Sequence, residues 1–367
     1  MRKVHILCHR PPWKRGFNHY FPILKWKKEL RSSNYSIFFK TNHRDSHILD
    51  CDILIVDARY YEQINKGYFA PKGFTSKSLD YIKKLLHNAE SRGVKKVLFD
   101  SSDSALFLVP ELVSYYDVIL KKQIFKKAEI YTCFEEQIKM YSWRPSLNYS
   151  EEYIQRASLP KETISKIRVG WNIGLCDYRK FPQFVHKYLP LGTSSILPRY
   201  YRHIEQLHPQ INKRVLVSYR GGLKGTPKYD SHRIKLLEKL FSLSNKNGVA
   251  FGSKIPLKHY LRELRNSKAI ISPFGYGEIC YRDFETLING SLLIKPSMDH
   301  LLTYPDIYEP GKTYIATKWD FSDIENIIDD VRNHYNDYLP IIKTAQSQFD
   351  YYYNSFTSFV QQFSQIY

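Results

Sequence analysis

Short apolar runs alternate with amphipathic segments along most of the chain. In the first 120 residues, apolar runs typical of strands lie at 4–8, 36–39, 52–56, 96–99 and 116–120. Between them, segments 21–30 and 78–92 place apolar residues three and four positions apart, which predicts helices. Strands that alternate with helices in this way predict an α/β fold, with a parallel sheet covered by helices on both faces.

A second alternating unit begins near residue 214. It contains strand candidates at 214–218, 248–251, 269–272, 292–296 and 313–316, with helix candidates at 232–244, 257–267 and 321–335. The stretch 135–200 is rich in proline and less regular, and we interpret it as periphery of the first unit plus a linker. We therefore expect domains over 1–195 and 196–340, followed by a C-terminal helix over 341–367 that has neither glycine nor proline.

The composition is that of a soluble globular protein. A length of 367 residues suits two domains, and 43% of the residues are hydrophobic and 25% charged. The five cysteines are scattered and form no Cys-x-x-Cys pair, so neither a disulfide framework nor a zinc site is predicted. The N-terminus reads as a first strand rather than a secretory signal, and we expect a cytoplasmic protein.

The net charge of +19 indicates an anionic partner. Such an excess attracts nucleotide phosphates, nucleic acid or the anionic inner face of a membrane. The positive residues are spread among tyrosines and apolar residues rather than gathered in one tract. Charge alone therefore does not choose among these partners, and peripheral membrane attachment is one expectation that it supports.

One loop combines glycines, carboxylates and an arginine. It runs from Ser272 to Gly290 between two apolar runs, and it contains Gly277, Glu278, Arg282 and Glu285. The carboxyl end of a strand is where open α/β sheets bind ligands, and the following helix N-terminus attracts an anion. Carboxylates suit hydroxyl groups instead, so the pattern predicts a ligand with both phosphates and a sugar.

This pattern resembles the donor-sugar motif of GT-B glycosyltransferases, in particular family-4-like and exostosin-like enzymes. The resemblance implies a GT-B fold, with two Rossmann-like domains, parallel sheets and a cleft between them. It also implies that Glu285 binds the ribose of a nucleotide-sugar donor. Six residues separate Glu278 from Glu285, one fewer than in the retaining family-4 pattern.

The segment 219–225 offers positive charge beside a flexible backbone. Its three glycines allow close approach to a ligand, and Arg220 and Lys224 supply fixed charge. The resemblance implies that this pair neutralises the leaving diphosphate of the donor. The alternative is a plain glycine turn with solvated charges, and the Gly-Lys-Ser/Thr ending of a phosphate-binding Walker A loop is absent.

Candidate acceptor-side residues follow strands of the first domain. Asp100 and Asp103 follow the run 96–99, and either carboxylate could take a proton from an acceptor hydroxyl. Asp100 is the stronger candidate because it directly ends the strand, whereas an Asx turn or helix cap is the alternative for both. His9 follows the first strand and is a third candidate, and we assign Lys121 and Lys122 to the solvated basic surface.

We therefore expect a glycosyltransferase of the kind that acts in polysaccharide biosynthesis. A nucleotide-sugar donor would bind the second domain, and a glycan or lipid-linked acceptor the first. No cluster has metal-ligand spacing, so we expect no metal or other cofactor. We also expect no nucleic-acid partner. The alternatives are a non-catalytic GT-B scaffold in a glycan-assembly complex and a basic nucleic-acid-binding protein.

Overall fold

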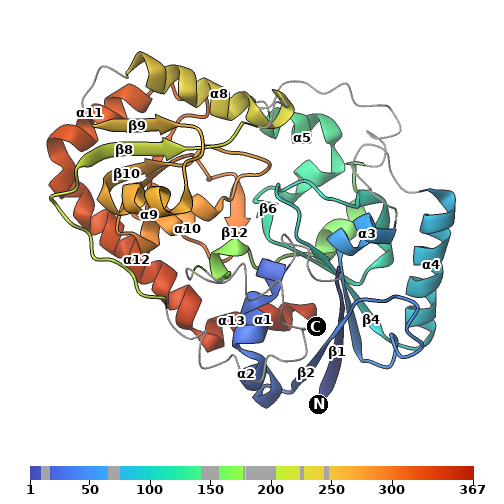
Figure 1. The fold of residues 1–367 in the computed structure, drawn as a ribbon. Coiled ribbons are helices and arrows are strands. Elements are labelled where there is room, and N and C mark those ends of the chain that lie inside the picture. The colour runs from blue at the N-terminus through green and yellow to red at the C-terminus, as the bar shows by residue number, and fades with distance from the viewer. Residues whose placement is uncertain are drawn as a thin grey trace.

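The structure is a computed structural model of the chain. It describes residues 1–9, 17–64, 75–141, 157–176, 178, 204–223, 227–243 and 248–367. The expected domain boundary near residue 195 and the candidate Lys224 lie outside the described residues. Figure 1 shows two lobes, each with its own sheet, and both chain termini on the N-terminal lobe.

The N-terminal lobe contains a six-stranded sheet in the order β2-β1-β3-β4-β5-β7, and every neighbouring pair is parallel. The strands are β1 (Arg2–Leu7), β2 (Tyr35–Lys40), β3 (Ile53–Asp57), β4 (Lys95–Asp100), β5 (Val118–Lys121) and β7 (Ile167–Val169). All five residues of β3 are buried, as expected of a central strand covered on both faces. The carboxyl ends of these strands consequently meet at one edge of the sheet.

Short helices surround this sheet. The α-helices are α1 (Phe21–Lys25), α2 (Lys27–Ser32), α3 (Ala58–Ile64), α4 (Ser76–Ser91) and α5 (Phe134–Met140). The 3-10 helices are η1 (Phe17–Tyr20), η2 (Pro110–Tyr115), η3 (Ala128–Thr132), η4 (Lys161–Lys166) and η5 (Ile173–Leu175). The sequence predicted α4 closely, because its apolar positions follow a helical spacing.

The C-terminal lobe repeats the plan with a five-stranded parallel sheet in the order β13-β11-β10-β8-β9. Its strands are β8 (Val215–Arg220), β9 (Val249–Gly252), β10 (Ser267–Ile271), β11 (Leu292–Pro296) and β13 (Ile315–Thr317). Its helices are α8 (Pro227–Ser242), α9 (Leu257–Asn266), α10 (Tyr281–Ile288) and α11 (Ile324–His334). Strands β8 and β10 are neighbours, so the loops that follow them lie side by side.

Two features join the lobes. Strand β6 (Gln123–Phe125) pairs antiparallel with β12 (Leu301–Thr303), and this small sheet lies between the two large ones (Figure 1). The C-terminal segment η6 (Tyr335–Tyr338), α12 (Leu339–Asn354), α13 (Phe356–Phe363) and η7 (Ser364–Ile366) runs from one lobe to the other. Its Phe363 packs edge-on against Tyr35 of β2, with ring centroids 5.3 Å apart. The chain end therefore covers the N-terminal sheet.

Candidate functional site

The loop between β10 and α10 is fixed by a buried network at the start of the helix. Cys280 caps α10, and its backbone N–H donates to the Asp283 carboxylate at 3.1 Å. Asp283 also pairs with Lys295 of β11 at 3.1 Å and accepts from the Tyr308 hydroxyl at 2.7 Å. The helix ends at Ile288, and the chain then turns at Gly290, whose φ of 61° lies in the left-handed region that glycine tolerates best. The direction of α10 is thereby determined.

Glu285 lies one turn into this helix and points toward α9. Its Oε2 accepts a hydrogen bond from the Tyr260 hydroxyl at 2.7 Å. Burial raises the pKa of Glu285 above its ordinary value, although Tyr260 and the neighbouring Arg282 act in the opposite direction. A carboxylate whose charged form is destabilised by its surroundings in this way is typical of a functional site.

Arg282 and Tyr219 retain unused hydrogen-bonding groups. Arg282 donates to the backbone carbonyl of Arg220, and its guanidinium lies 5.1 Å from the centre of the Tyr219 ring. Within the described part of the chain, the buried Arg282 Nε and Tyr219 hydroxyl have no hydrogen-bond partner. Buried polar atoms are nearly always paired, so these two groups indicate a place for a polar ligand.

Arg220, the last residue of β8, is engaged by a carboxylate of α9. Its guanidinium makes a two-pronged contact with Glu263 of α9, at 2.8 to 3.1 Å, and donates to the Phe251 carbonyl at 2.8 Å. This arginine is therefore held along the sheet edge. Arg233 of α8 takes the place between the loops instead. It donates to the Gly222 carbonyl at 2.9 Å, and it lies so close to Gly275 that a Cβ there would overlap it.

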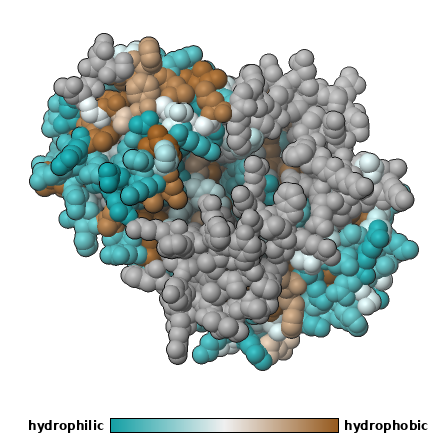
Figure 2. Space-filling model, in the orientation of Figure 1, coloured by the Kyte–Doolittle hydropathy of each residue, from teal (hydrophilic) through white to brown (hydrophobic). Residues whose placement is uncertain are grey.

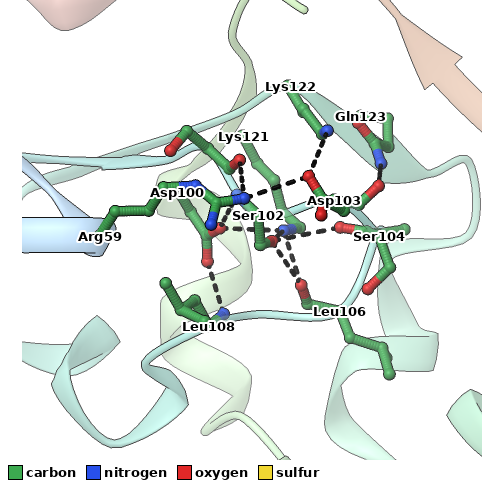
Figure 3. Close-up of polar contacts among 12 residues, drawn as sticks. Arg59, Asp100, Ser102, Asp103, Ser104, Leu106, Leu108, Lys121, Lys122 and Gln123 are labelled. Carbon is green, nitrogen blue, oxygen red and sulfur yellow. Dashed lines mark hydrogen bonds and ion pairs between the residues drawn. The ribbon is translucent and has the colours of Figure 1, made fainter. Parts of the chain in front are cut away.

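Asp100, at the end of β4, has no exposed carboxylate oxygen. It pairs with Lys121 at 3.3 Å and accepts from the backbone N–H groups of Ser102 and Leu108 at 2.9 and 2.8 Å (Figure 3). Burial alone would raise the pKa of Asp100, but Lys121 and these hydrogen bonds outweigh it and lower the pKa. The contacts favour a structural role that organises the loop after β4.

Asp103 occupies the outer position in the same loop. Its side chain is 44% exposed, and it pairs with Arg59 at 3.1 Å and with Lys122 at 3.6 Å. Figure 3 shows both cations converging on this carboxylate. The assignment of Lys121 and Lys122 to the solvated surface is wrong, because both side chains are almost fully buried. Each carries its charge against a carboxylate, which offsets part of the cost of burial.

The two candidate loops meet although they belong to different lobes. Gly277 packs against Asp103 so closely that a Cβ at Gly277 would overlap the Asp103 carbonyl oxygen. Glu278 is buried, and its two carboxylate oxygens accept from the Tyr141 hydroxyl and from Gln123 Nε2. Glu278 is thus engaged by the N-terminal lobe.

His9 lies partly buried just after β1. A second histidine, His19, was not predicted from the sequence as a candidate. Its ring is buried, and its Nδ1 has no partner among the described residues. Burial, followed by the charges of Lys122 and Arg59, lowers the pKa of His19 well below its ordinary value. His19 is therefore neutral beside the cations that flank Asp103.

No three His, Cys, Asp or Glu side chains of the described residues gather as ligands of a metal ion. The expectation that no cofactor is needed remains a prediction. No described helix combines the length and hydropathy that crossing a bilayer requires.

The likeness to known proteins lies in the fold and not in the sequence. No protein-family model and no curated protein matches the chain. An alpha-glucosyltransferase solved with UDP and a 13-mer DNA containing an HMU base is 11% identical, with a TM-score of 0.50 over 100% of this chain and 99% of that one. HepE of Anabaena, solved with UDP-glucose, is 11% identical over 100% and 99%, with a TM-score of 0.46. The predicted GT-B fold, with two Rossmann-like halves, is confirmed.

Proposed function

We propose that the protein is a glycosyltransferase that transfers a sugar from a nucleotide-sugar donor to an acceptor hydroxyl. The observation that carries the proposal is the group around Glu285. It combines the half-buried Glu285 carboxylate, whose pKa is raised, with the Arg282 Nε and the Tyr219 hydroxyl, which have no hydrogen-bond partner among the described residues. All three lie at the carboxyl edge of a parallel sheet, where nucleotides bind in such folds. Support also comes from the similar alpha-glucosyltransferase, which was solved with UDP.

Different residues of this site suit different parts of the nucleotide-sugar donor. Glu285 suits the ribose hydroxyls, because an ionised carboxylate is a strong hydrogen-bond acceptor. Arg282 and Arg233, with the glycine-rich loop after β8, suit the diphosphate. Arg220 supports this loop through Glu263, and Lys224 remains a candidate phosphate ligand that lies outside the described residues.

The transfer step needs a base and a stabilised leaving group. The acceptor oxygen forms a bond to the anomeric carbon of the sugar, while the bond from that carbon to the phosphate oxygen breaks. The nucleoside diphosphate leaves with the electron pair, and its charge is stabilised by the arginines. The acceptor proton passes to a carboxylate, and Asp103 is the better candidate because Asp100 has no exposed oxygen.

We propose a glycan or a lipid-linked sugar as the acceptor. The expectation that nucleic acid is no partner is not carried forward, because a structure of the same fold was solved with both UDP and DNA. A hydroxyl on modified DNA and a hydroxyl on a glycan both have to lose a proton to the base during transfer, so the chemistry does not distinguish them. Transfer of radiolabelled sugar to membrane extract or to hydroxymethylated DNA would separate the two acceptor classes.

Nucleotide binding is the first test. Thermal-shift measurements with UDP-, GDP-, CMP- and TDP-sugars should show stabilisation by at least one, since a ligand that binds only the folded state raises its stability. The stabilisation should disappear in Glu285→Ala. A folded wild-type protein that is stabilised by none of them would refute the proposal. Binding without sugar transfer or donor hydrolysis would instead favour a non-catalytic scaffold.

We further propose peripheral attachment to an anionic membrane. Lys258, Arg262 and Arg265 are exposed on α9, together with Leu257. Figure 2 shows apolar residues among hydrophilic ones on the C-terminal lobe. Each cation near an anionic bilayer surface contributes about 1 kcal/mol. Flotation with anionic but not neutral liposomes at low salt is expected, and charge reversal of the three cations should abolish it.

A further inference from the structure

One side chain joins the two halves of the candidate site. Gln123, the first residue of β6, is fully buried, and its Nε2 donates to the backbone carbonyl of Asp103 at 2.8 Å (Figure 3). The same Nε2 donates to Glu278 Oε2 at 3.1 Å. Asp103 belongs to the loop after β4, and Glu278 belongs to the loop after β10. A single amide group therefore bridges the two loops.

Gln123 is itself held in place by both lobes. Its backbone pairs with Thr303 in the antiparallel β6–β12 sheet. The second carboxylate oxygen of Glu278 is taken by Tyr141, so Glu278 cannot turn away from Gln123 without breaking another contact. Gly277 completes the junction, because its missing side chain lets the backbone reach Asp103.

We propose that Gln123 is a positioning residue that sets the separation between Asp103 and the loop after β10, which carries Gly277 and Glu278. The inference rests on the proposed function, since that separation matters for catalysis only if donor and acceptor meet here. A base acts within about 3 Å of the oxygen it deprotonates, and a displacement of about 1 Å can lower the rate about 100-fold. Nucleotide affinity should change little, because Glu285 and Tyr260 do not contact Gln123.

Gln137 provides a matched control. It is also a buried glutamine of the N-terminal lobe, and its Nε2 also makes two hydrogen bonds, in this case to the backbone carbonyls of Tyr131 and Ala157 at 3.1 and 3.2 Å. Gln137→Leu therefore removes the same number of hydrogen bonds away from the loop junction. The kinetic probe is UDP-glucose, with release of UDP as the readout and UDP affinity measured by calorimetry.

Gln123→Leu is expected to lower kcat for UDP release at least tenfold below that of Gln137→Leu, with UDP affinity within about twofold of wild type. Equal turnover in the two variants would overturn the inference. Amide hydrogen exchange supplies a readout that does not depend on activity. Exchange should become faster at both 102–105 and 275–278 in Gln123→Leu, but not in Gln137→Leu.

Unchanged exchange at either loop would also overturn the inference. A wild-type protein that neither binds UDP nor releases it from UDP-glucose would count against the proposed function with this donor. The exchange measurement would then still decide whether Gln123 links the loops. The two failures are thus distinguishable.

Discussion

Gly277 lies directly against the backbone carbonyl of Asp103, with no room for a side chain between them. Gly277 belongs to the loop after β10, and Asp103 to the loop after β4. The contact therefore brings together the carboxyl edges of the two sheets. It also places the exposed Asp103 carboxylate on the same side of the molecule as the donor loop.

Gly277→Ala should consequently separate the loops. We expect a lower melting temperature and a loss of turnover, because the added methyl group can be accommodated only if a backbone moves. Gly170→Ala is a graded control, since the nearest atoms to its Cβ would lie at 3.3 Å. Thermal melting and UDP release check this prediction. Equal melting temperatures for the two variants would contradict it.

Glu285→Gln should lower nucleotide affinity without lowering the thermal stability of the protein. The substitution removes a half-buried carboxylate whose raised pKa indicates an unfavourable environment for its charge, so thermal stability should be retained or increased. Nucleotide affinity should fall about ten- to a hundredfold, because a charge-assisted hydrogen bond contributes about 1.5–3 kcal/mol. Calorimetry and melting curves on the same preparation provide the test. Unchanged affinity would remove Glu285 from the donor site.

The sequence predicted most strands of the two sheets, because these strands are apolar runs of four or five residues bounded by polar segments. It could not predict β6, β7 and β12, which have three residues each and are stabilised by partners distant in the chain. The same limit applies to side chains. From the sequence alone Lys121 and Lys122 resemble surface residues, and their burial depends on one carboxylate at the end of β4 and one in the loop after it.

Arg233 was missed for a related reason. In the sequence it is one more cation in an amphipathic helix, and only the neighbouring positions of β8 and β10 place it between Gly222 and Gly275. Glu285, by contrast, could be singled out, because its strand–loop–helix context is local. The spacing of apolar residues within one segment predicts a helix or a strand. Which segments pair with each other can be known only from the three-dimensional fold.

His232 should make the protein sensitive to mild acid. Its Nδ1 accepts from the Phe274 backbone N–H at 3.1 Å, and its ring packs on Phe321 and Phe274. Burial, assisted by Lys295, lowers the pKa of His232 to about 3. The unfolded chain binds this proton near pH 6.5 and the folded protein does not, so stability is lost as pH falls below about 6.5.

The loss from this group should approach about 1.4 kcal/mol per pH unit below that point. Urea denaturation at pH 7.5, 6 and 5 measures it. Other buried histidines contribute to the same slope, so the comparison is with His232→Gln, which cannot take up the proton. The variant should have a shallower dependence of unfolding free energy on pH, and identical slopes would contradict the assignment.

Asp100 and Asp103 should have opposite phenotypes. Asp100→Asn leaves the buried Lys121 without its carboxylate, and breaking a buried pair in this way costs about 3–5 kcal/mol. Asp103→Asn should destabilise less, because the Asp103 side chain is 44% exposed and an amide oxygen in its place can still accept from Arg59 and Lys122. It should lower turnover about 10²–10⁴-fold. Urea denaturation and UDP release measure the two effects. A folded Asp103→Asn variant with wild-type turnover would move the search for the base to His9 and His19.

The last prediction concerns the two arginines near the glycine-rich loop. Arg233 lies between the loops after β8 and β10, whereas Arg220 is held by Glu263. Charge that acts on the leaving diphosphate matters most as the glycosidic bond breaks, so its loss lowers kcat more than it raises KM. Arg233→Ala should therefore lower kcat about ten- to a hundredfold with a small change in KM.

Arg220→Ala should act mainly through stability, since it leaves the Glu263 carboxylate without its two-pronged partner. The paired variant Glu263→Gln decides between the roles. If Arg220 serves only to hold the loop, Glu263→Gln should lower the melting temperature as Arg220→Ala does. If Arg220 contacts phosphate, Glu263→Gln should release the arginine and tighten UDP binding in calorimetry. That result, together with normal turnover in Arg233→Ala, would return the leaving-group role to Arg220.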